Sequence, residues 1–161
     1  LTGLLTRRAY NKISEQLEKD YERVRSHYAI VFFDIDHFKN VNDTYGHEAG
    51  DVILSTFAKI LASQTRDIDI LARYGGEEFI ALIKYQKVKE VTSYVERVKK
   101  IIGANKFKYQ NQSIQVTFSA GITLRVDHLT YAGAIQKADV LLYEAKEGGR
   151  DQIRLEDGTI I

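Results

Sequence analysis

The sequence predicts an α+β domain in which a central antiparallel sheet of about five strands is flanked by helices in a ferredoxin-like order. Two observations predict this class. The apolar periodicity contains a strand–helix–hairpin–helix–strand core, without the strict alternation of strands and helices that a doubly wound fold requires. The 161 residues are 44% hydrophobic and contain no proline, which suits a single domain over residues 1–161 with one core.

The first half of the chain predicts helices around one buried strand. Residues 6–26 are expected to be helical because apolar residues recur at spacings of three and four: Tyr10, Ile13, Leu17, Tyr21 and Val24. The segment "HYAIVFFDID" (27–36) is rich in β-branched and aromatic residues and predicts a buried strand. A short helix is expected to begin at Asp36 or His37. A long helix follows over 47–66, with one apolar face: Ala49, Val52, Ile53, Phe57, Ile60 and Leu61.

The second half predicts a hairpin, two more helices and a further strand. "DILARYGGEEFIALIKY" reads as two short strands around a Gly-Gly turn. A helix is expected near 87–103, with the apolar stripe Val88, Val91, Val95, Val98 and Ile102. "SIQVTFSAGITL" (113–124) predicts a strand, and 152–161 an edge hairpin. The last helix, near 131–147, ends at two glycines and turns these residues inward: Ala134, Ile135, Ala138, Leu142 and Ala145.

The composition excludes several classes of function. Lys and Arg number 23 and Asp and Glu 22, so charge gives no reason to expect a nucleic-acid partner or contact of this domain with a membrane surface. The absence of cysteine excludes disulfides and zinc–thiolate centres and suits a cytoplasmic protein. No apolar run reaches the ~20 residues that span a bilayer. Because the chain begins at Leu1 and lacks methionine, we expect a domain excised from a longer protein, which could itself be tethered to a membrane.

Acidic residues at the end of the first strand indicate a metal site. Asp36 is expected to be the N-cap of the short helix, whereas Asp34 follows directly on buried strand residues. The hairpin, which carries Glu77 and Glu78, is expected to pair with this strand and to bring Asp34 close to Glu77. Converging carboxylates raise each other's pKa unless a cation lies between them. In nucleotide sites Mg²⁺ takes one or two carboxylates and completes its shell with phosphates and water.

The glycine pair Gly75–Gly76 allows two interpretations. The hairpin tip can be a solvated turn that carries two incidental glutamates. Alternatively, glycines allow the backbone to approach a phosphate closely, because they carry no side chain. The pair alone does not decide between them.

Taken together, several separated motifs resemble one known family. "DIDHFKNVNDTYGHEAGD" followed by "RYGGEEF" resembles the diguanylate cyclases, the GGDEF domains, in the variant spelled GGEEF. "LTGLLTRRAY", "VTFSAGIT" and "ADVLLYEAKEGGRD" are similar to the opening and closing motifs of that family, so the resemblance covers nearly the whole chain. It implies a nucleotidyl-cyclase-type sheet with the motif on a β-hairpin. It also implies that two GTP molecules are condensed into cyclic di-GMP with release of two pyrophosphates.

Carried over residue by residue, the resemblance implies a catalytic metal site. Asp34, Glu77 and the backbone carbonyl of Ile35 would bind Mg²⁺, or Mn²⁺ in its place. Glu77 would favour deprotonation of the attacking 3′-hydroxyl, and Glu78 would serve a second metal or the hydroxyl. Lys39 would stabilise charge on the phosphates.

The resemblance also implies a GTP pocket. Asn42 and Asp51 would read guanine, since a carboxylate accepts from the N1–H and N2–H donors that adenine lacks. His47 and Phe38 either line this pocket or are a helix-start histidine and a core aromatic. The remaining pocket residues are the two turn glycines, Gly75 and Gly76, and two cations near the triphosphate, Lys146 and Arg150. The two cations have a second interpretation, because positive charge near a helix C-terminus is favoured by the helix dipole.

A second site is implied upstream of the hairpin. Arg66 and Asp69 have the Arg-x-x-Asp spacing of the inhibitory site in the family, where product cyclic di-GMP binds, and Arg97 fits a third member. An Arg-x-x-Asp spacing alone is more often a surface ion pair. The role of Arg73 stays open between this site and a solvated strand position.

Two alternatives follow for the function. The first is an active cyclase that works as an antiparallel homodimer, controlled by an upstream sensory or receiver domain in the full protein. The second is a catalytically silent domain that acts as a receptor for cyclic di-GMP or GTP. Silent relatives usually lack the hairpin glutamates or the strand-end aspartate, and this chain retains Asp34, Glu77 and Glu78. A purely structural domain would leave these polar clusters unexplained.

Overall fold

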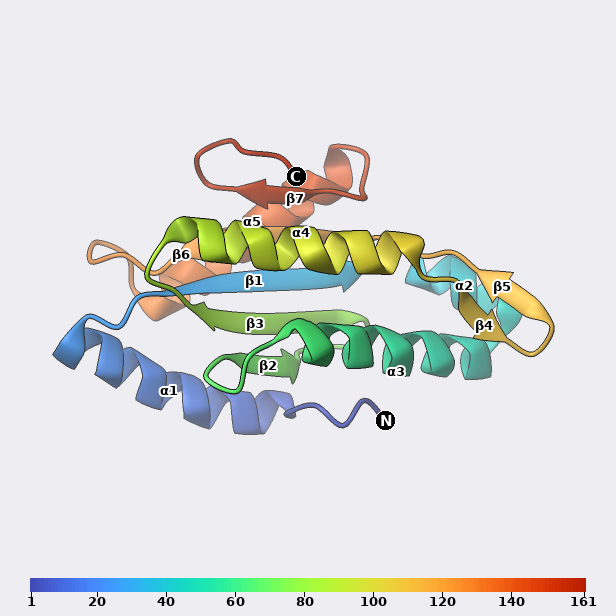
Figure 1. Ribbon diagram of the computed structural model, residues 1–161, viewed down its shortest axis with the longest axis horizontal. Coiled ribbons are helices and arrows are strands. Elements are labelled where there is room, and N and C mark those ends of the chain that lie inside the picture. Colours follow the sequence, from blue (N-terminus) through green and yellow to red (C-terminus); the bar gives the residue numbers. More distant parts are fainter.

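The computed structural model describes residues 1–161 and confirms the predicted class of fold (Figure 1). The elements, in chain order, are α1 (Arg7–Val24), β1 (Tyr28–Ile35), α2 (Phe38–Tyr45), α3 (His47–Gln64), β2 (Ile70–Arg73), β3 (Glu78–Lys84), α4 (Val88–Ala104), β4 (Phe107–Tyr109), β5 (Gln112–Ile114), β6 (Phe118–Leu124), α5 (Tyr131–Glu147) and β7 (Ile153–Leu155). The predicted helices and the hairpin are all present, with ends that differ by a few residues from those expected.

The central sheet has the strand order β2-β3-β1-β6-β7. β1 lies between β3 and β6 and is antiparallel to both, and β2 is antiparallel to β3. The expectation of a wholly antiparallel sheet is wrong at one edge, where β7 runs parallel to β6. The sheet is mixed because α5 carries the chain back across the sheet before β7 begins, so β7 starts at the same end as β6. After β7 the chain folds back and Ile153 and Ile161 exchange backbone hydrogen bonds, as the predicted edge hairpin requires.

Helices cover both faces of the sheet, and this arrangement buries β1 completely (Figure 1). Alternate residues of a strand point to opposite faces. Ala29, Val31 and Phe33 therefore pack in the core beneath α3 and α4. Ile30 and Phe32 pack in the second core, against α1 and α5. A strand that is apolar on both faces cannot tolerate an acid in its interior, so Asp34 can occur only near its end.

Some local predictions are wrong. The predicted strand over 113–124 is divided into β5 and β6, and β5 pairs with β4 in a separate small hairpin that the sequence analysis missed. In α1 the predicted inward residues Ile13 and Val24 are exposed, as is Val88 at the first position of α4. The buried residues of α1 are Tyr10, Ser14, Leu17 and Tyr21, because this helix packs on the sheet along a narrow stripe.

Asp36 is not an N-cap, contrary to expectation. The residue before α2 is His37, which has a φ of 55° and makes no side-chain capping bond. Asp36 is instead buried and accepts hydrogen bonds from Thr117, Ser119 and the backbone of Asp151. The reason is that β1 leaves the sheet beside β6, so the side chain points at β6 and not at the first turn of α2.

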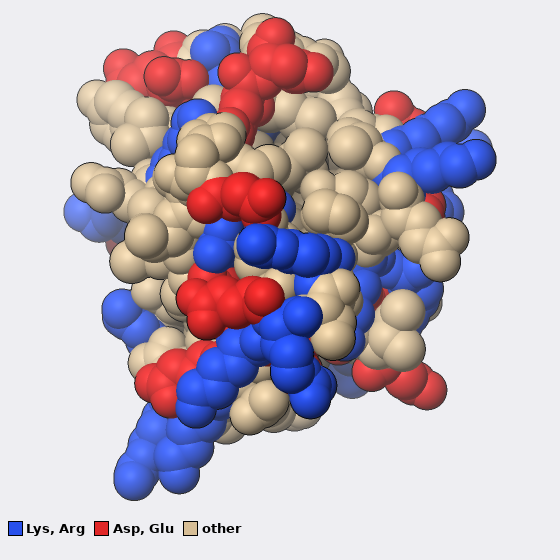
Figure 2. Space-filling view, turned by 90° about the vertical axis from the view of Figure 1, so that its left-hand side faces the viewer, with Lys and Arg blue, Asp and Glu red and all other residues tan.

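The surface agrees with the balanced composition. On the end of the molecule where β1 begins, acidic and basic side chains are interspersed (Figure 2). No helix combines the length and the apolar composition that crossing a membrane requires.

Candidate active site

The end of β1 brings together acids from two strands. In the sheet register Asp34 lies opposite Glu78 on β3, and the backbone N–H of Ile35 donates to the carbonyl of Glu77 over 3.3 Å. Asp34 is 5% exposed, while both glutamates are half-buried. Asp34 therefore meets the hairpin as predicted, but the register pairs it with Glu78 and not with the expected Glu77.

The electrostatics of this cluster favour a bound cation. Burial raises the pKa of Asp34 above its ordinary value, although the ammonium of Lys146 lies 2.8 Å from its carboxylate and acts in the opposite direction. Burial and then the charge of Asp34 raise the pKa of both Glu77 and Glu78. Of the three carboxylates only Asp34 has an ion pair, which leaves excess negative charge in the cluster to be neutralised.

The hairpin turn is built to hold Glu78 in place. The backbone N–H groups of Tyr74 and Gly75 both donate to the carbonyl of Glu78, at 2.8 and 3.2 Å. Arg73 donates from its guanidinium to the carbonyls of Gly75 and Gly76, so it braces the turn. A Cβ atom at Gly75 would lie 2.3 Å from a carboxylate oxygen of Glu78, whereas one at Gly76 would meet open space. Gly75 therefore makes room for the acid, and Gly76 leaves an open approach to the turn.

The predicted guanine-reading residues lie where α2 meets α3. The backbone N–H of Gly46 donates to the carbonyl of Asn42, which ends α2 and begins α3 almost at once. The side chain of Asn42 lies against Gly50, where a Cβ atom would be 2.0 Å from its oxygen. Asp51 follows Gly50, and both Asp51 and His47 are exposed. Asn42 and Asp51 thus belong to one surface.

Phe38 and Lys39 begin α2 and point in different directions. Phe38 is buried in the core, with its ring tip 3.1 Å from a Cβ atom placed on Gly50, so it supports the helix contact beneath Asn42. The core interpretation of Phe38 is therefore the one that its burial supports. Lys39 is exposed and makes no ion pair.

The two predicted phosphate-binding cations come from the end of α5. Lys146 is in the last turn of that helix and pairs with Asp34. Arg150 lies in the following loop, is exposed, and its positive charge lowers the pKa of Asp34 against the dominant effect of burial. Both side chains therefore reach the carboxylate cluster from the opposite side to the hairpin.

One acid near the cluster was missed from the sequence. Asp139 on α5 is close enough for its charge to raise the pKa of Glu78, although less than burial and Asp34 do. Its spacing of seven residues from Lys146 places both on one face of the helix, and this was the available signal.

The residues fit a magnesium ion better than a closed metal cage. No three His, Asp or Glu side chains are arranged as a complete metal-binding group. Mg²⁺ does not need one, because it keeps waters and takes one or two carboxylates together with phosphates of its substrate. The hard oxygen donors of Asp34 and the hairpin glutamates at the end of β1 fit such an ion.

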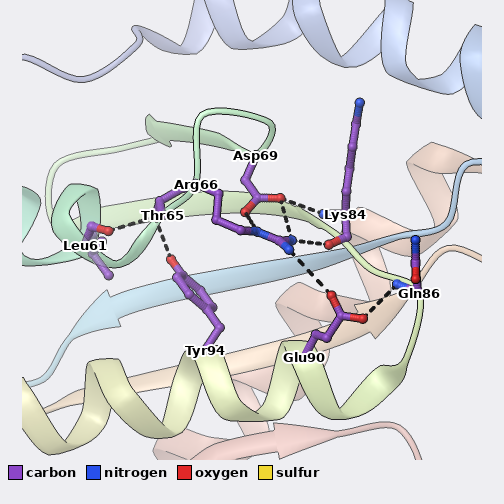
Figure 3. Close-up of polar contacts among 8 residues, drawn as sticks. All are labelled: Leu61, Thr65, Arg66, Asp69, Lys84, Gln86, Glu90 and Tyr94. Carbon is purple, nitrogen blue, oxygen red and sulfur yellow. Dashed lines mark hydrogen bonds and ion pairs between the residues drawn. The ribbon is translucent and has the colours of Figure 1, made fainter.

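Two of the predicted inhibitory residues, Arg66 and Asp69, lie against each other beside Lys84, at the end of β3 (Figure 3). Arg66, Asp69 and Arg97 all line a cavity of about 370 Å³ between the end of α3 and α4. The guanidinium of Arg66 pairs with Asp69 at 2.8 Å and contacts the carbonyl of Lys84, whose N–H donates to Asp69. Asp69 is thereby anchored to the end of β3.

Glu90 is a further member of this cavity that the sequence analysis missed. Its carboxylate lies 3.5 Å from the guanidinium of Arg66 and accepts the backbone N–H groups of Gln86 and Lys87. These bonds hold the pKa of Glu90 below its ordinary value. A capping glutamate at the third position of α4 was the signal that could have identified it.

Comparison with known proteins agrees with this geometry. The family model described as "Diguanylate cyclase, GGDEF domain" matches residues 1–152. Diguanylate cyclase A of Treponema denticola is 39% identical over 82% of this chain and 36% of its own length. DgcZ of Escherichia coli, also a diguanylate cyclase, is 35% identical over 98% of this chain and 52% of its own. The chain thus spans from about a third to about half of these two relatives.

A solved structure has the same fold over nearly its full length. The GGDEF domain of DgcB from Caulobacter crescentus, in complex with c-di-GMP, superposes with a TM-score of 0.93 at 27% identity, and the match covers 98% of this chain and 94% of that one. Together with the family match over residues 1–152, this similarity shows that the chain belongs to the diguanylate cyclase family of GGDEF domains.

Proposed function

We propose that this domain is a diguanylate cyclase that condenses two GTP molecules into cyclic di-GMP and two pyrophosphates. The observation that carries the proposal is the convergence of Asp34, Glu78 and Lys146 at the end of β1, beside the open glycine turn. Carboxylates that can hold a metal, next to cations that can neutralise phosphate, form the set that phosphoryl chemistry requires. The relatives named diguanylate cyclases and the c-di-GMP complex support the same activity.

Asp34, Glu77 and the carbonyl of Ile35 would hold Mg²⁺ or Mn²⁺. The bound ion would supply charge that polarises the phosphate and eases loss of the hydroxyl proton. Glu77 then takes the role of accepting the 3′-hydroxyl proton, with Glu78 beside it, because burial and the charge of Asp34 raise the proton affinity of both. Lys39, Lys146 and Arg150 would stabilise the phosphate oxygens, and the turn at Gly75 and Gly76 would lie against them.

Guanine would bind where α2 meets α3. Asp51 would accept from the N1–H and N2–H groups of the base, and Asn42 would complete the pattern with its amide. Adenine has no N1–H donor, so it would leave the carboxylate of Asp51 unpaired. His47 would border the same pocket.

Catalysis would require two copies of the domain in antiparallel arrangement. Each copy holds one GTP, and the 3′-oxygen of one nucleotide attacks the α-phosphorus of the other. The bond to pyrophosphate breaks on each side as the new phosphodiester forms. An upstream sensory or receiver domain would act by controlling this homodimer.

Product inhibition would act through the cavity around Arg66. Its guanidinium and that of Arg97 would bind phosphate or guanine edges of cyclic di-GMP, and Asp69 would accept from guanine donors. The existing Arg66–Asp69 pair supports this because it preorganises both groups at the cavity.

The test is direct synthesis by the purified protein. GTP and Mg²⁺ are incubated with the wild type, with Asp34→Asn and with an artificially dimerised version, and cyclic di-GMP is quantified by chromatography. We expect product from the wild type, more from the dimerised version, and a loss of at least about a hundredfold in Asp34→Asn, as for removal of a group that stabilises transition-state charge. A dimerised protein that binds GTP without forming product would make the domain a nucleotide receptor instead.

A further inference from the structure

Asp36 is a buried acid whose contacts are unusual for its position. It is 4% exposed, and none of the ion pairs in the structure includes it. One carboxylate oxygen accepts the hydroxyl of Ser119 at 2.7 Å. The other accepts the hydroxyl of Thr117 at 2.7 Å and the backbone N–H of Asp151 at 3.0 Å. A buried carboxylate without a cation depends on such donors, so these three contacts fix its position.

The contact with Asp151 reaches a backbone segment that needs support. Arg150 and Asp151 have φ values of 64° and 48°, so two successive residues with side chains adopt the left-handed region. This region is unfavourable for L-residues and persists where the surroundings impose it. The side chain of Lys99 holds the same segment from outside, by donating to the carbonyl of Asp151 over 2.7 Å.

This segment determines where Arg150 lies. The guanidinium of Arg150 makes no hydrogen bond or ion pair with the protein, so the position of its backbone sets the region that the side chain can reach. Asp36 lies directly after β1, two residues beyond Asp34. Asp36 therefore connects the strand that carries the candidate metal ligand to the loop that carries the free arginine.

We propose that Asp36 is a positioning residue that, by holding the Asp151 N–H, keeps the guanidinium of Arg150 directed at the triphosphate of GTP. The inference rests on the proposed nucleotide site, and it concerns binding of the phosphates, not of the base. Asp36 does not touch the nucleotide in this arrangement. Its effect must therefore disappear when Arg150 is absent.

The test is a double-mutant cycle on nucleotide affinity. The full chain is titrated calorimetrically with 3′-deoxy-GTP, which cannot condense, and with 3′-deoxy-GMP, which lacks the two outer phosphates. The variants are Asp36→Ala, Asp36→Asn, Arg150→Ala and the Asp36→Ala/Arg150→Ala double variant. Asp36→Asn is the conservative rescue: its amide oxygen still accepts from Asp151, and the hydroxyl of Ser119 can turn to accept from its NH₂.

We expect Asp36→Ala and Arg150→Ala each to weaken 3′-deoxy-GTP binding about tenfold, as for loss of one charge-assisted contact. The double variant should bind 3′-deoxy-GTP no more weakly than Arg150→Ala does. The affinity of Asp36→Asn for 3′-deoxy-GTP should stay within about threefold of wild type. The affinity for 3′-deoxy-GMP should hardly change in any of these variants. Losses that multiply in the double variant, or an equal loss for both nucleotides, would overturn the positioning role. Ser119→Ala, which removes one bond to Asp36 and leaves the bond to Asp151, is the matched control and should bind like wild type.

Hydrogen exchange gives a second measurement that does not depend on a variant folding. The amide of Asp151 should be protected in the wild type, because its N–H donates to the buried carboxylate of Asp36. Exchange of this amide at the rate of an open loop in the wild type would overturn the proposal. A wild type that binds 3′-deoxy-GTP but makes no cyclic di-GMP would refute the cyclase and leave this role of Asp36 intact; a wild type that binds no nucleotide would refute both.

Discussion

At the scale of single residues, the end of β1 brings together acidic side chains whose repulsion lowers the stability of the fold. Asp34 is almost fully buried, and Glu78 lies opposite it in the sheet. Like charges directly opposite each other destabilise a strand pair. A protein without a ligand to bind would lose nothing by replacing one of them with an amide. The repulsion between these two carboxylates therefore lowers the stability of the free protein, as is common where activity and stability conflict.

Glu78→Gln should stabilise the free protein at neutral pH by about 0.5 kcal/mol, the scale of a like-charge cross-strand pair. The folded-state pKa of Glu78 is raised, so its ionisation costs stability as pH rises from its ordinary value through the raised one. The advantage of the variant should thus vanish below about pH 4, where the carboxyl is protonated in both states. Urea unfolding of both proteins between pH 4 and 8 checks this, and a variant less stable than wild type at pH 7 would contradict it.

Gly50→Ala should weaken GTP binding with little effect on folding. The new methyl group would lie 2.0 Å from the side-chain oxygen of Asn42, which must then move. Alanine in a helix is itself favourable by up to about 1 kcal/mol, which offsets the local strain. We expect the KM for GTP to rise roughly tenfold, as for one lost hydrogen bond to the base. Asn42→Ala should give the same increase, and an unchanged KM in either variant would exclude Asn42 from the pocket.

At the scale of elements, α5 packs on β6 through a glycine. A Cβ atom at Gly121 would lie 2.1 Å from the carbonyl oxygen of Ala138 and 2.6 Å from the backbone nitrogen of Leu142. Backbone atoms of a helix cannot give way locally, so Gly121→Ala must displace α5 from the sheet. We expect a loss of about 3 kcal/mol in the free energy of unfolding, measured with urea.

The matched control is Gly103→Ala in α4, where an added Cβ meets nothing within 4 Å. This variant should be more stable than wild type by about 0.5 kcal/mol, because alanine is the better helix former. Equal effects of the two substitutions would mean that the contact between α5 and β6 does not limit stability.

The attachment of α1 to the sheet depends on a largely buried ion pair. Arg125, just after β6, donates to both carboxylate oxygens of Glu18 and lies with its guanidinium 4.3 Å from the ring centre of Tyr21. Burial alone would raise the pKa of Glu18, but bonds from Arg125 and from the hydroxyl of Tyr28 outweigh it and hold the pKa below its ordinary value. The carboxylate of Glu18 thus links α1 to Tyr28 on β1 and to Arg125 directly after β6.

Arg125→Met should cost about 3 kcal/mol at pH 7, because it leaves Glu18 charged without a cation. Since the folded pKa of Glu18 is depressed, the stability that the pair provides is present above the ordinary carboxyl value and is lost as pH falls through the folded value. The difference between variant and wild type should therefore shrink below about pH 4.5. Thermal unfolding over pH 3 to 7 tests this, and a difference independent of pH would assign the loss to packing alone.

At the scale of the whole molecule, the two candidate sites lie at opposite ends of one strand. β3 begins at Glu78 in the carboxylate cluster and ends at Lys84, whose backbone binds both Arg66 and Asp69. An interior strand of the sheet therefore connects the cavity to the carboxylate cluster.

Arg66→Ala should relieve inhibition by product without abolishing synthesis. We expect the cyclic di-GMP concentration that halves the initial rate to rise at least about tenfold, as for loss of one bidentate charged contact. The control is Lys89→Ala, which changes another residue that lines the same cavity. In this variant the cyclic di-GMP concentration that halves the rate should stay within about threefold of wild type if Arg66 is the specific contact. Rates measured against added cyclic di-GMP decide this, and inhibition that is unchanged in Arg66→Ala would assign that residue to structure alone.

The sequence was sufficient for the elements with strong periodicity or tight turns. The continuous apolar run of β1, the Gly-Gly hairpin and the helix of α4 depend on neighbours within a few residues, and all three are present as predicted, with Val88 as the exposed exception in the apolar stripe of α4. The small hairpin of β4 and β5 was missed because its strands have three residues each, too few for a recognisable period. The exposed Ile13 and Val24 show the converse: spacing identifies a helix, but not how wide a face it buries.

The sequence by itself determined the helices, the hairpin and the acids at the end of β1, because each is encoded by a short-range pattern or motif. Tertiary structure alone decided that β7 runs parallel to β6, that Asp34 faces Glu78 in the register, and that Asp36 binds β6 and the loop after α5 instead of capping α2. The physical reason is that these contacts join residues far apart in the sequence. Asp36 and Asp151 are 115 positions apart, and only the assembled sheet brings the carboxylate of Asp36 to the N–H of Asp151.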